Sequence, residues 1–177
     1  MLNINLDKIT DLDFKTKEAY KTLRTNVQFC GNDVKIISLT SCVPNEGKSM
    51  VSFNLAISMA ETGKKVLFID ADLRKSVLIG RYKINKAIKG LTQYLSGVEQ
   101  LDDVRYSTNV KNMDLILSGP VPPNPAELLN NEKFTELLET ARKEYDYVII
   151  DTPPIGQVID PAIVAQQTDG VIFLISQ

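Results

Sequence analysis

Short apolar runs alternate with amphipathic runs along most of the chain. The apolar runs cover residues 34–40, 66–69, 113–117, 147–151 and 171–175. Each run predicts a strand buried on both faces, which is typical of a parallel sheet. The amphipathic runs predict helices at residues 15–28, 50–59, 91–95, 132–143 and 162–167, and one more that begins at Pro125. This alternation predicts an α/β fold, a mostly parallel sheet with helices on both faces.

The residues that follow the predicted strands are polar and mostly charged. Right-handed crossovers place the carboxyl ends of parallel strands at one edge of the sheet. The side chains expected at that edge are Lys48, Ser49, Asp70, Asp72 and Asp151. The pattern therefore predicts that one lysine, one hydroxyl and three carboxylates come together.

The loop after the first apolar run ends in Gly47, Lys48 and Ser49, the close of a phosphate-binding P-loop. Free N–H groups and the positive end of the helix dipole meet at such a helix start. Lys48 is expected to reach the β- and γ-phosphates, and Ser49 is expected to bind Mg²⁺. The residues expected to hold the nucleotide are Pro44, Asn45, Glu46, Gly47, Lys48, Ser49 and Met50.

Cys42 stands where this type of loop usually has its first glycine. The loop must therefore turn there without a residue that adopts positive φ freely. The competing interpretation of the motif alone is a β-turn into a helix that binds nothing.

Three carboxylates lie at the ends of apolar runs. Asp70 and Asp72 follow residues 66–69, where burial is costly unless a positive charge pairs with them. A Mg²⁺–nucleotide would supply that charge. The alternative is a solvated loop in which Asp72 pairs with Arg74. Asp151 ends the run 147–151 in the Walker B pattern, in which the carboxylate orients Mg²⁺.

A further aspartate, Asp160, precedes the predicted helix 162–167. An acidic side chain there is expected to cap the helix or to pair with its dipole.

Composition narrows the possible chemistry. The chain has 177 residues, enough for one domain, and its net charge of −2 with mixed signs gives no nucleic-acid signal. The absence of histidine excludes Ser-His-Asp triads and most zinc sites. Cys30 and Cys42 have neither metal spacing nor a disulfide framework, so free thiols in a reducing cytosol are expected. No apolar run approaches the roughly 20 residues that span a bilayer.

The helix predicted at residues 15–28 has two faces. Tyr20, Leu23 and Val27 form an apolar stripe, whereas Glu18, Lys21 and Arg24 recur every three residues and share a neighbouring face. Periodicity alone leaves two possibilities for that charged face, a solvated edge or an interface.

The chain resembles the bacterial tyrosine kinases, the P-loop kinases of capsule and exopolysaccharide systems, over about residues 15–177. Residues 18–26 resemble the family's oligomerisation helix Glu-x-x-Arg-x-x-Arg, with Lys21 in place of the first arginine. Residues 44–49, 66–74 and 148–151 resemble its Walker A, A′ and B segments, and residues 118–129 resemble a further family stretch. The resemblance implies a single P-loop kinase domain, residues 1–177, with a P-loop NTPase-type sheet.

The resemblance also implies roles for the residues of the site. ATP and Mg²⁺ would be the cofactors, and Ser49, Asp72 and Asp151 would bind the metal. Lys48 would act in catalysis, and Asp70 would accept the proton of an incoming tyrosine hydroxyl, with Asp72 as the alternative. Arg74 would pair with these carboxylates or make subunit contacts.

Partners are implied in the same way. The family forms ring-like homo-oligomers, here through Glu18, Lys21 and Arg24, and phosphorylates tyrosine-bearing proteins. A membrane adaptor of the polysaccharide co-polymerase type would hold the kinase in the cytoplasm at the inner face of the membrane. The six tyrosines do not form the cluster of the family's tail. We therefore expect a domain truncated at its C-terminus.

Two other functions compete with the kinase. One is an ATPase switch like those of plasmid partition and division-site selection, which carry an extra lysine early in the P-loop. Cys42, Val43 and Pro44 occupy that part here, which argues against the switch. The other is a nucleotide-binding scaffold without turnover.

Overall fold

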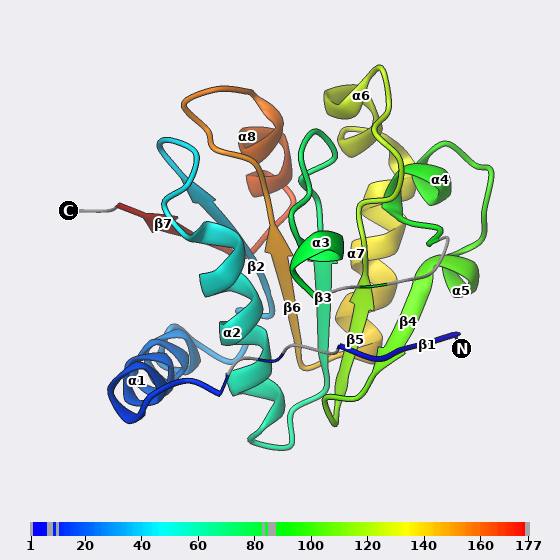
Figure 1. Ribbon diagram of the computed structural model, residues 1–177. Coiled ribbons are helices and arrows are strands. Elements are labelled where there is room, and N and C mark those ends of the chain that lie inside the picture. Colours follow the sequence, from blue (N-terminus) through cyan, green and yellow to red (C-terminus); the bar gives the residue numbers. More distant parts are fainter. Residues whose placement is uncertain (1, 7–8, 10, 83, 85–87, 176–177) are drawn as a thin grey trace.

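The computed structural model describes residues 2–6, 9, 11–82, 84 and 88–175. Within these residues, seven strands form one sheet in the order β1-β4-β5-β3-β6-β2-β7 (Figure 1). The strands are β1 (Leu2–Ile4), β2 (Ile36–Ser41), β3 (Val66–Asp70), β4 (Arg105–Thr108), β5 (Met113–Ile116), β6 (Tyr147–Asp151) and β7 (Gly170–Leu174). Every neighbouring pair is parallel except β4 and β5. The predicted mostly parallel sheet is confirmed.

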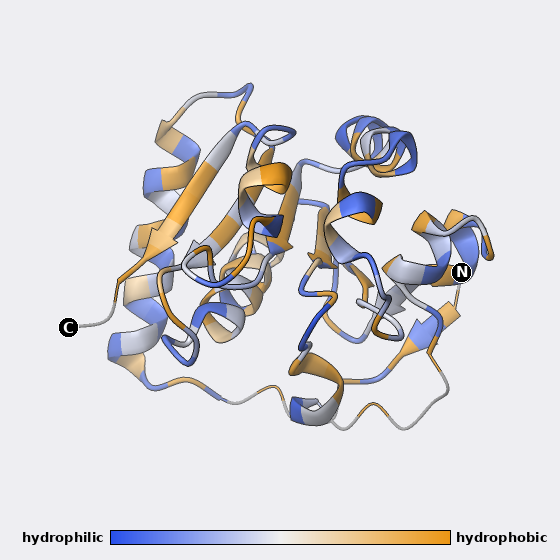
Figure 2. Cartoon of the chain, turned by 90° about the horizontal axis from the view of Figure 1, so that it is seen from above, coloured by the Kyte–Doolittle hydropathy of each residue, from blue (hydrophilic) through white to orange (hydrophobic). Residues whose placement is uncertain are grey.

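Helices cover both faces of this sheet, as predicted. They are α1 (Phe14–Phe29), α2 (Lys48–Ala60), α3 (Leu78–Arg81), α4 (Leu91–Leu95), α5 (Leu101–Val104), α6 (Pro125–Leu129), α7 (Glu132–Glu144) and α8 (Asp160–Ala165). The first three pack on one face in one apolar cluster, and the other five contribute to a second cluster on the opposite face. Figure 2 shows the hydrophobic residues concentrated on the strands between these layers.

Aromatic packing fixes α2, and with it the P-loop, over the centre of the sheet. Phe53 of α2 is fully buried and meets Phe68 of β3 edge to face, with ring centroids 5.1 Å apart. The ring of Tyr82, just after α3, lies 4.4 Å from the ring of Phe53. Such contacts add to the free energy gained from burial alone. As a result, α2 and α3 are held on the same side of β3.

The sequence pattern did not predict β1, β4, α3 or α5, each of which is at most four residues long. Because β4 was not predicted, its antiparallel pairing with β5 was missed as well. Of the two roles expected for Asp160, the N-terminal cap is wrong, whereas its place in the first turn of α8 agrees with pairing to the helix dipole. Ile159 occupies the cap position, and Asp160 is the first residue of α8.

Candidate active site

The P-loop joins the end of β2 to the start of α2 and turns at two residues of positive φ. Asn45 has φ 68° and Gly47 has φ 80° in the left-handed region, which favours glycine. The positive φ angles thus fall at Asn45 and Gly47 and not at Cys42, whose side chain disfavours that conformation. The amides of Met50 and Val51 donate to the Gly47 carbonyl at 3.0 and 2.9 Å. No side chain caps α2, so its first amides are available to a ligand.

A cavity of about 400 Å³ opens at this helix start, between the P-loop, the segment after β3 and the segment after β6. Six of the seven residues expected to hold the nucleotide line it, namely Pro44, Asn45, Gly47, Lys48, Ser49 and Met50. Glu46 is not among the lining residues. Its carboxylate accepts a hydrogen bond from the Val43 amide at 3.1 Å and closes the loop.

Lys48 and Asp151 form a buried ion pair at the base of the cavity. The Nζ of Lys48 lies 2.8 Å from Oδ1 of Asp151 and 3.3 Å from Oγ of Ser49. Lys48 is 6% exposed and Asp151 is 1% exposed. Burial raises the pKa of Asp151, and the ion pair with Lys48 opposes that shift. The carboxylate of the Walker B strand therefore faces the P-loop lysine.

Asp70 lies beside Asp151, because β3 and β6 are paired with these two residues in register. Asp70 is 1% exposed, and burial together with the charge of Asp151 raises its pKa to about 7. The hydroxyl of Ser76 donates to Oδ2 of Asp70, and the amide of Asp72 donates to Oδ1 at 3.2 Å. A buried carboxyl that exchanges its proton near neutral pH is suited to general acid–base chemistry.

Asp72 lies at the edge of the cavity and is turned back on its own chain. Its Oδ1 accepts hydrogen bonds from the amides of Arg74 at 3.3 Å and Lys75 at 2.9 Å. Among the described residues, no three acidic, histidine or cysteine side chains are arranged to hold a metal ion by themselves. In proteins Mg²⁺ is usually bound by one or two carboxylates together with phosphates and waters.

Arg74 does not pair with the site carboxylates. Its Nε and Nη2 donate to the two carboxylate oxygens of Asp160 at 2.8 and 2.9 Å. The Asp160 side chain is fully buried, so the two-pronged contact ties the segment after β3 to α8. The expected side-chain pairing of Arg74 with Asp70, Asp72 or Asp151 is wrong, because the guanidinium is used by Asp160.

The charged residues of α1 separate into two sets. Nη1 of Arg24 donates to the Ser58 carbonyl on α2 at 2.7 Å, so Arg24 is held within the chain. Lys21 and Glu18 pair with each other at 2.7 Å, and both are about half exposed. Phe14 and Phe29 are 79% and 84% exposed at the two ends of the helix. The solvated edge and the interface both remain possible for Glu18 and Lys21.

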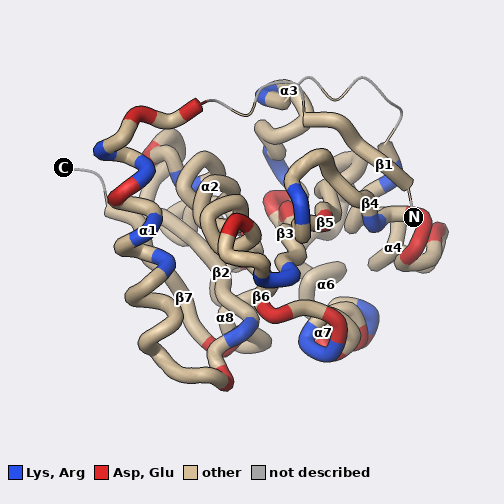
Figure 3. Tube along the Cα trace, turned by 90° about the horizontal axis from the view of Figure 1, so that it is seen from below, with Lys and Arg blue, Asp and Glu red and all other residues tan. Residues whose placement is uncertain are grey.

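Several residues of the cavity were not identified from the sequence. Ser76, Lys75 and Arg81 follow the predicted Walker A′ segment without matching a motif, and only folding brings them to the cavity or to Asp70. The sequence feature that could have pointed to them is the run of basic residues after Asp72. Figure 3 shows that Lys and Arg elsewhere are interspersed with Asp and Glu.

Within the described part of the chain, no helix has the length and apolarity needed to cross a membrane.

Known proteins are similar to this chain in sequence, and solved structures are similar to it in fold. Residues 34–176 match the family described as AAA domain. The tyrosine-protein kinase CpsD of Streptococcus agalactiae serotype III (strain NEM316) is 49% identical over 160 residues, which cover 90% of this chain and 69% of that protein. The tyrosine-protein kinase YwqD of Bacillus subtilis (strain 168) is 41% identical over 174 residues, 97% of this chain and 73% of that protein.

A solved structure is similar over nearly the same range. The kinase domain of the Escherichia coli tyrosine kinase ETK superposes with a TM-score of 0.85 at 34% identity. The match covers 94% of this chain and 69% of that domain. The fold of this chain thus occurs in a solved protein of similar sequence.

Proposed function

The chain belongs to the bacterial tyrosine kinases, and we propose that it transfers the γ-phosphoryl group of ATP to tyrosine side chains of proteins. The observation that carries this proposal is the cluster at the edge of the sheet. A buried carboxyl, Asp70, lies next to the Lys48–Asp151 pair at the base of the cavity of about 400 Å³.

A P-loop fold binds a nucleotide, and we assign ATP with Mg²⁺ to this site. The uncapped start of α2, the left-handed Gly47 and the cavity beside them fit a phosphate chain. Lys48 would neutralise the phosphates, and Ser49, Asp72 and Asp151 would bind the metal. The metal, when bound, stabilises the charge of the phosphoryl group during transfer.

Asp70 is proposed as the acceptor of the tyrosine proton. The phenol has an ordinary pKa of about 10, so it reacts with its proton still attached until late in the transfer. A bond forms between the phenol oxygen and the γ-phosphorus, and the bond from that phosphorus to the bridging oxygen of ADP breaks. Asp70 takes the proton and returns it to solvent, and the products are phosphotyrosine and ADP.

We further propose that the kinase forms a ring-like homo-oligomer and regulates the synthesis and export of capsular or exopolysaccharide. A membrane adaptor of the polysaccharide co-polymerase type would hold it at the cytoplasmic face of the membrane. Family membership supports these proposals, and so does the exposed face of α1, where Glu18 and Lys21 lie between Phe14 and Phe29.

The decisive experiment incubates the protein with γ-labelled ATP, Mg²⁺ and a tyrosine peptide. We expect label on tyrosine, and we expect Lys48→Met to abolish it because the charge on the transferred phosphate is lost. Lys143→Met, at an exposed lysine on α7, is the matched control and should retain full activity. Circular dichroism checks that Lys48→Met is folded, since the substitution leaves Asp151 without its cation.

The other outcomes identify the competing functions. Release of free phosphate with no labelled tyrosine would indicate the ATPase switch. Nucleotide binding with neither product would indicate the scaffold. Normal phosphorylation by Lys48→Met would show that the P-loop assignment is wrong.

A further inference from the structure

The segment after the Walker A′ aspartates has basic residues but no acidic ones. Residues 73–98 contain no aspartate or glutamate, yet they include Arg74, Lys75, Arg81 and Lys89 among the described positions. Arg74 is used by Asp160, and Lys89 pairs with Glu99 at 2.9 Å. Lys75 and Arg81 are both exposed, and neither has an ion-pair partner among the described residues.

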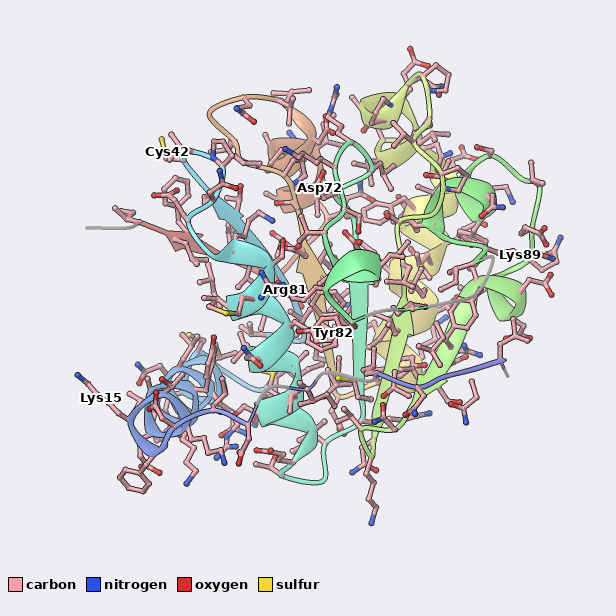
Figure 4. All side chains as sticks on the ribbon, viewed as in Figure 1. Lys15, Cys42, Asp72, Arg81, Tyr82 and Lys89 are labelled. Atoms are coloured by element: carbon pink, nitrogen blue, oxygen red, sulfur yellow. The ribbon has the colours of Figure 1, made fainter. Side chains whose placement is uncertain are left out.

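Both of these cations line the same cavity as Lys48, Ser49 and Asp72. In Figure 4, Arg81 lies beside α2, and Asp72 lies further along at the end of β3. α3 has one charged residue, the basic Arg81, and Figure 3 shows no acidic residue on this helix. The two side chains therefore place unneutralised positive charge at the rim of the site.

Their main-chain positions are fixed on both sides. The amide of Lys75 donates to Oδ1 of Asp72 at 2.9 Å, next to the candidate metal ligand. Arg81 lies between Leu78, which is 1% exposed, and Tyr82, whose ring packs on Phe53. Because the backbone at Lys75 and Arg81 is already held in place, a ligand that binds these charges does not have to order it, which lowers the entropic cost of binding.

Lys75 and Arg81, the rim cations, come from a different segment of the chain than the residues expected to bind phosphate. Lys48 and the start of α2 line the cavity from the P-loop, whereas Lys75 and Arg81 line it from the segment that follows Asp70 and Asp72. The acceptor tyrosine must approach Asp70. Its flanking residues therefore pass the wall that holds the two cations, and nearby carboxylates are attracted to unpaired cations.

We propose that Lys75 and Arg81 select acceptor segments with an anionic side chain, a carboxylate or a phosphate, next to the tyrosine. This inference rests on the proposed tyrosine kinase activity and names its substrate class. The guanidinium of Arg81 can bind a carboxylate or a phosphate with two parallel hydrogen bonds.

The test uses four peptides of equal length in which the residue before tyrosine is Asp, Asn, Lys or phosphotyrosine. At low ionic strength, kcat/KM for the Asp and phosphotyrosine peptides should exceed that for the Asn peptide roughly fivefold, the scale of two exposed ion pairs. The Lys peptide should be the poorest substrate. Added salt should remove the preference, because exposed charges are screened.

Two variants and a control locate the effect. Lys75→Gln with Arg81→Gln should equalise the four peptides while leaving the KM for ATP within about twofold, because rim charges act mainly on the passing segment. Lys75→Glu with Arg81→Glu should reverse the order in favour of the Lys peptide. Lys143→Gln removes an exposed lysine on α7 that does not line the cavity, and it should keep the wild-type preference.

Two results would overturn the inference. One is wild-type kinetics that are equal for all four peptides. The other is a large rise in the KM for ATP in the Gln variant with the peptide preference intact, which would assign the cations to the nucleotide. Binding of the same peptides with phenylalanine in place of the acceptor tyrosine, followed by fluorescence anisotropy, reports the preference without turnover. Loss of kinase activity on every peptide with preserved anisotropy differences would count against the proposed function alone.

Discussion

The environment of Asp70 sets it apart from the other carboxylates of the site. Asp151 has Lys48 as a direct partner, and Asp72 accepts main-chain amides, whereas Asp70 is buried with a hydroxyl and an amide as donors. Burial and the neighbouring Asp151 bring its pKa to about 7. A group with this pKa can take up a proton at neutral pH, which suits the acceptor role proposed for it.

Asp70→Asn tests that role. The amide cannot accept the phenol proton, so kcat should fall by about 10²- to 10⁴-fold, the usual contribution of a positioned base. Affinity for ATP should change little, because Asp70 does not line the nucleotide cavity. Quench-flow kinetics and a nucleotide-binding titration measure the two effects. If Asp72→Asn shows the loss of kcat and Asp70→Asn does not, the proton acceptor is Asp72.

Residues that act within a local motif could be predicted from the sequence, and residues that act across the fold could not. Lys48 and Ser49 are identified by adjacent residues, and Asp151 by the strand that it ends. The structure brings these residues and Asp70 to one edge of the sheet, but their roles stay predictions. The pairing of Arg74 with Asp160 spans 86 positions and has no local signature.

At the scale of elements, Asp169 joins three of them. Its Oδ2 accepts hydrogen bonds from the amides of Lys35 at 2.9 Å and Ile36 at 2.8 Å, where β2 begins. Its Oδ1 accepts from Arg142 of α7 at 2.6 Å, and β7 begins at the next residue. Burial raises the pKa of Asp169, but these donors outweigh burial and hold it below its usual value.

Asp169→Asn should therefore make stability less dependent on pH. A carboxylate with a lowered folded pKa stabilises the protein above its unfolded pKa of about 3.9, and the contribution is lost as the pH falls through the folded value. Near neutral pH the variant should lose about 1–3 kcal/mol of unfolding free energy. The difference from wild type should shrink in acid.

Urea unfolding near neutral pH and in acid measures this difference. Asp33→Asn, at an exposed aspartate in the turn before β2, removes the same charge and should leave stability within a few tenths of a kcal/mol. An Asp169→Asn deficit that is constant across pH would mean that shape, not charge, matters at this position.

Long apolar runs predicted their elements well, because a strand buried on both faces needs an unbroken apolar sequence. The boundaries of β6 are those predicted, and β3 extends one residue further, to Asp70. The edge strand β1 and its neighbour β4 are short, and β4 is only partly buried. Their pairing depends on neighbours distant in the sequence, so periodicity within each segment contains no signal for them.

At the scale of the whole molecule, the question is whether the outward face of α1 is a solvated edge or a subunit interface. Glu18 and Lys21 face outward, whereas Arg24 is bound to Ser58 of α2. Exposed aromatic side chains at both ends of the helix, Phe14 and Phe29, are typical of interface anchors.

Glu18→Ala with Lys21→Ala should reduce the mass measured by light scattering if α1 joins subunits. Stability should change by less than about 0.5 kcal/mol, because the pair is exposed. Arg24→Ala, in contrast, is expected to lower stability, because it removes a hydrogen bond between α1 and α2. An unchanged mass in the first variant would assign Glu18 and Lys21 to a solvated edge.

The contact between Cys42 and Gly156 joins the two walls of the cavity. The amide of Gly156 donates to the Cys42 carbonyl at 3.1 Å, and a Cβ built on Gly156 would lie only 2.3 Å from that oxygen. Any residue with a side chain at position 156 would therefore push the backbone there away from the backbone at Cys42. The close backbone contact thus ties the phosphate loop to the connection after the Walker B strand, and it requires a residue without a side chain at position 156.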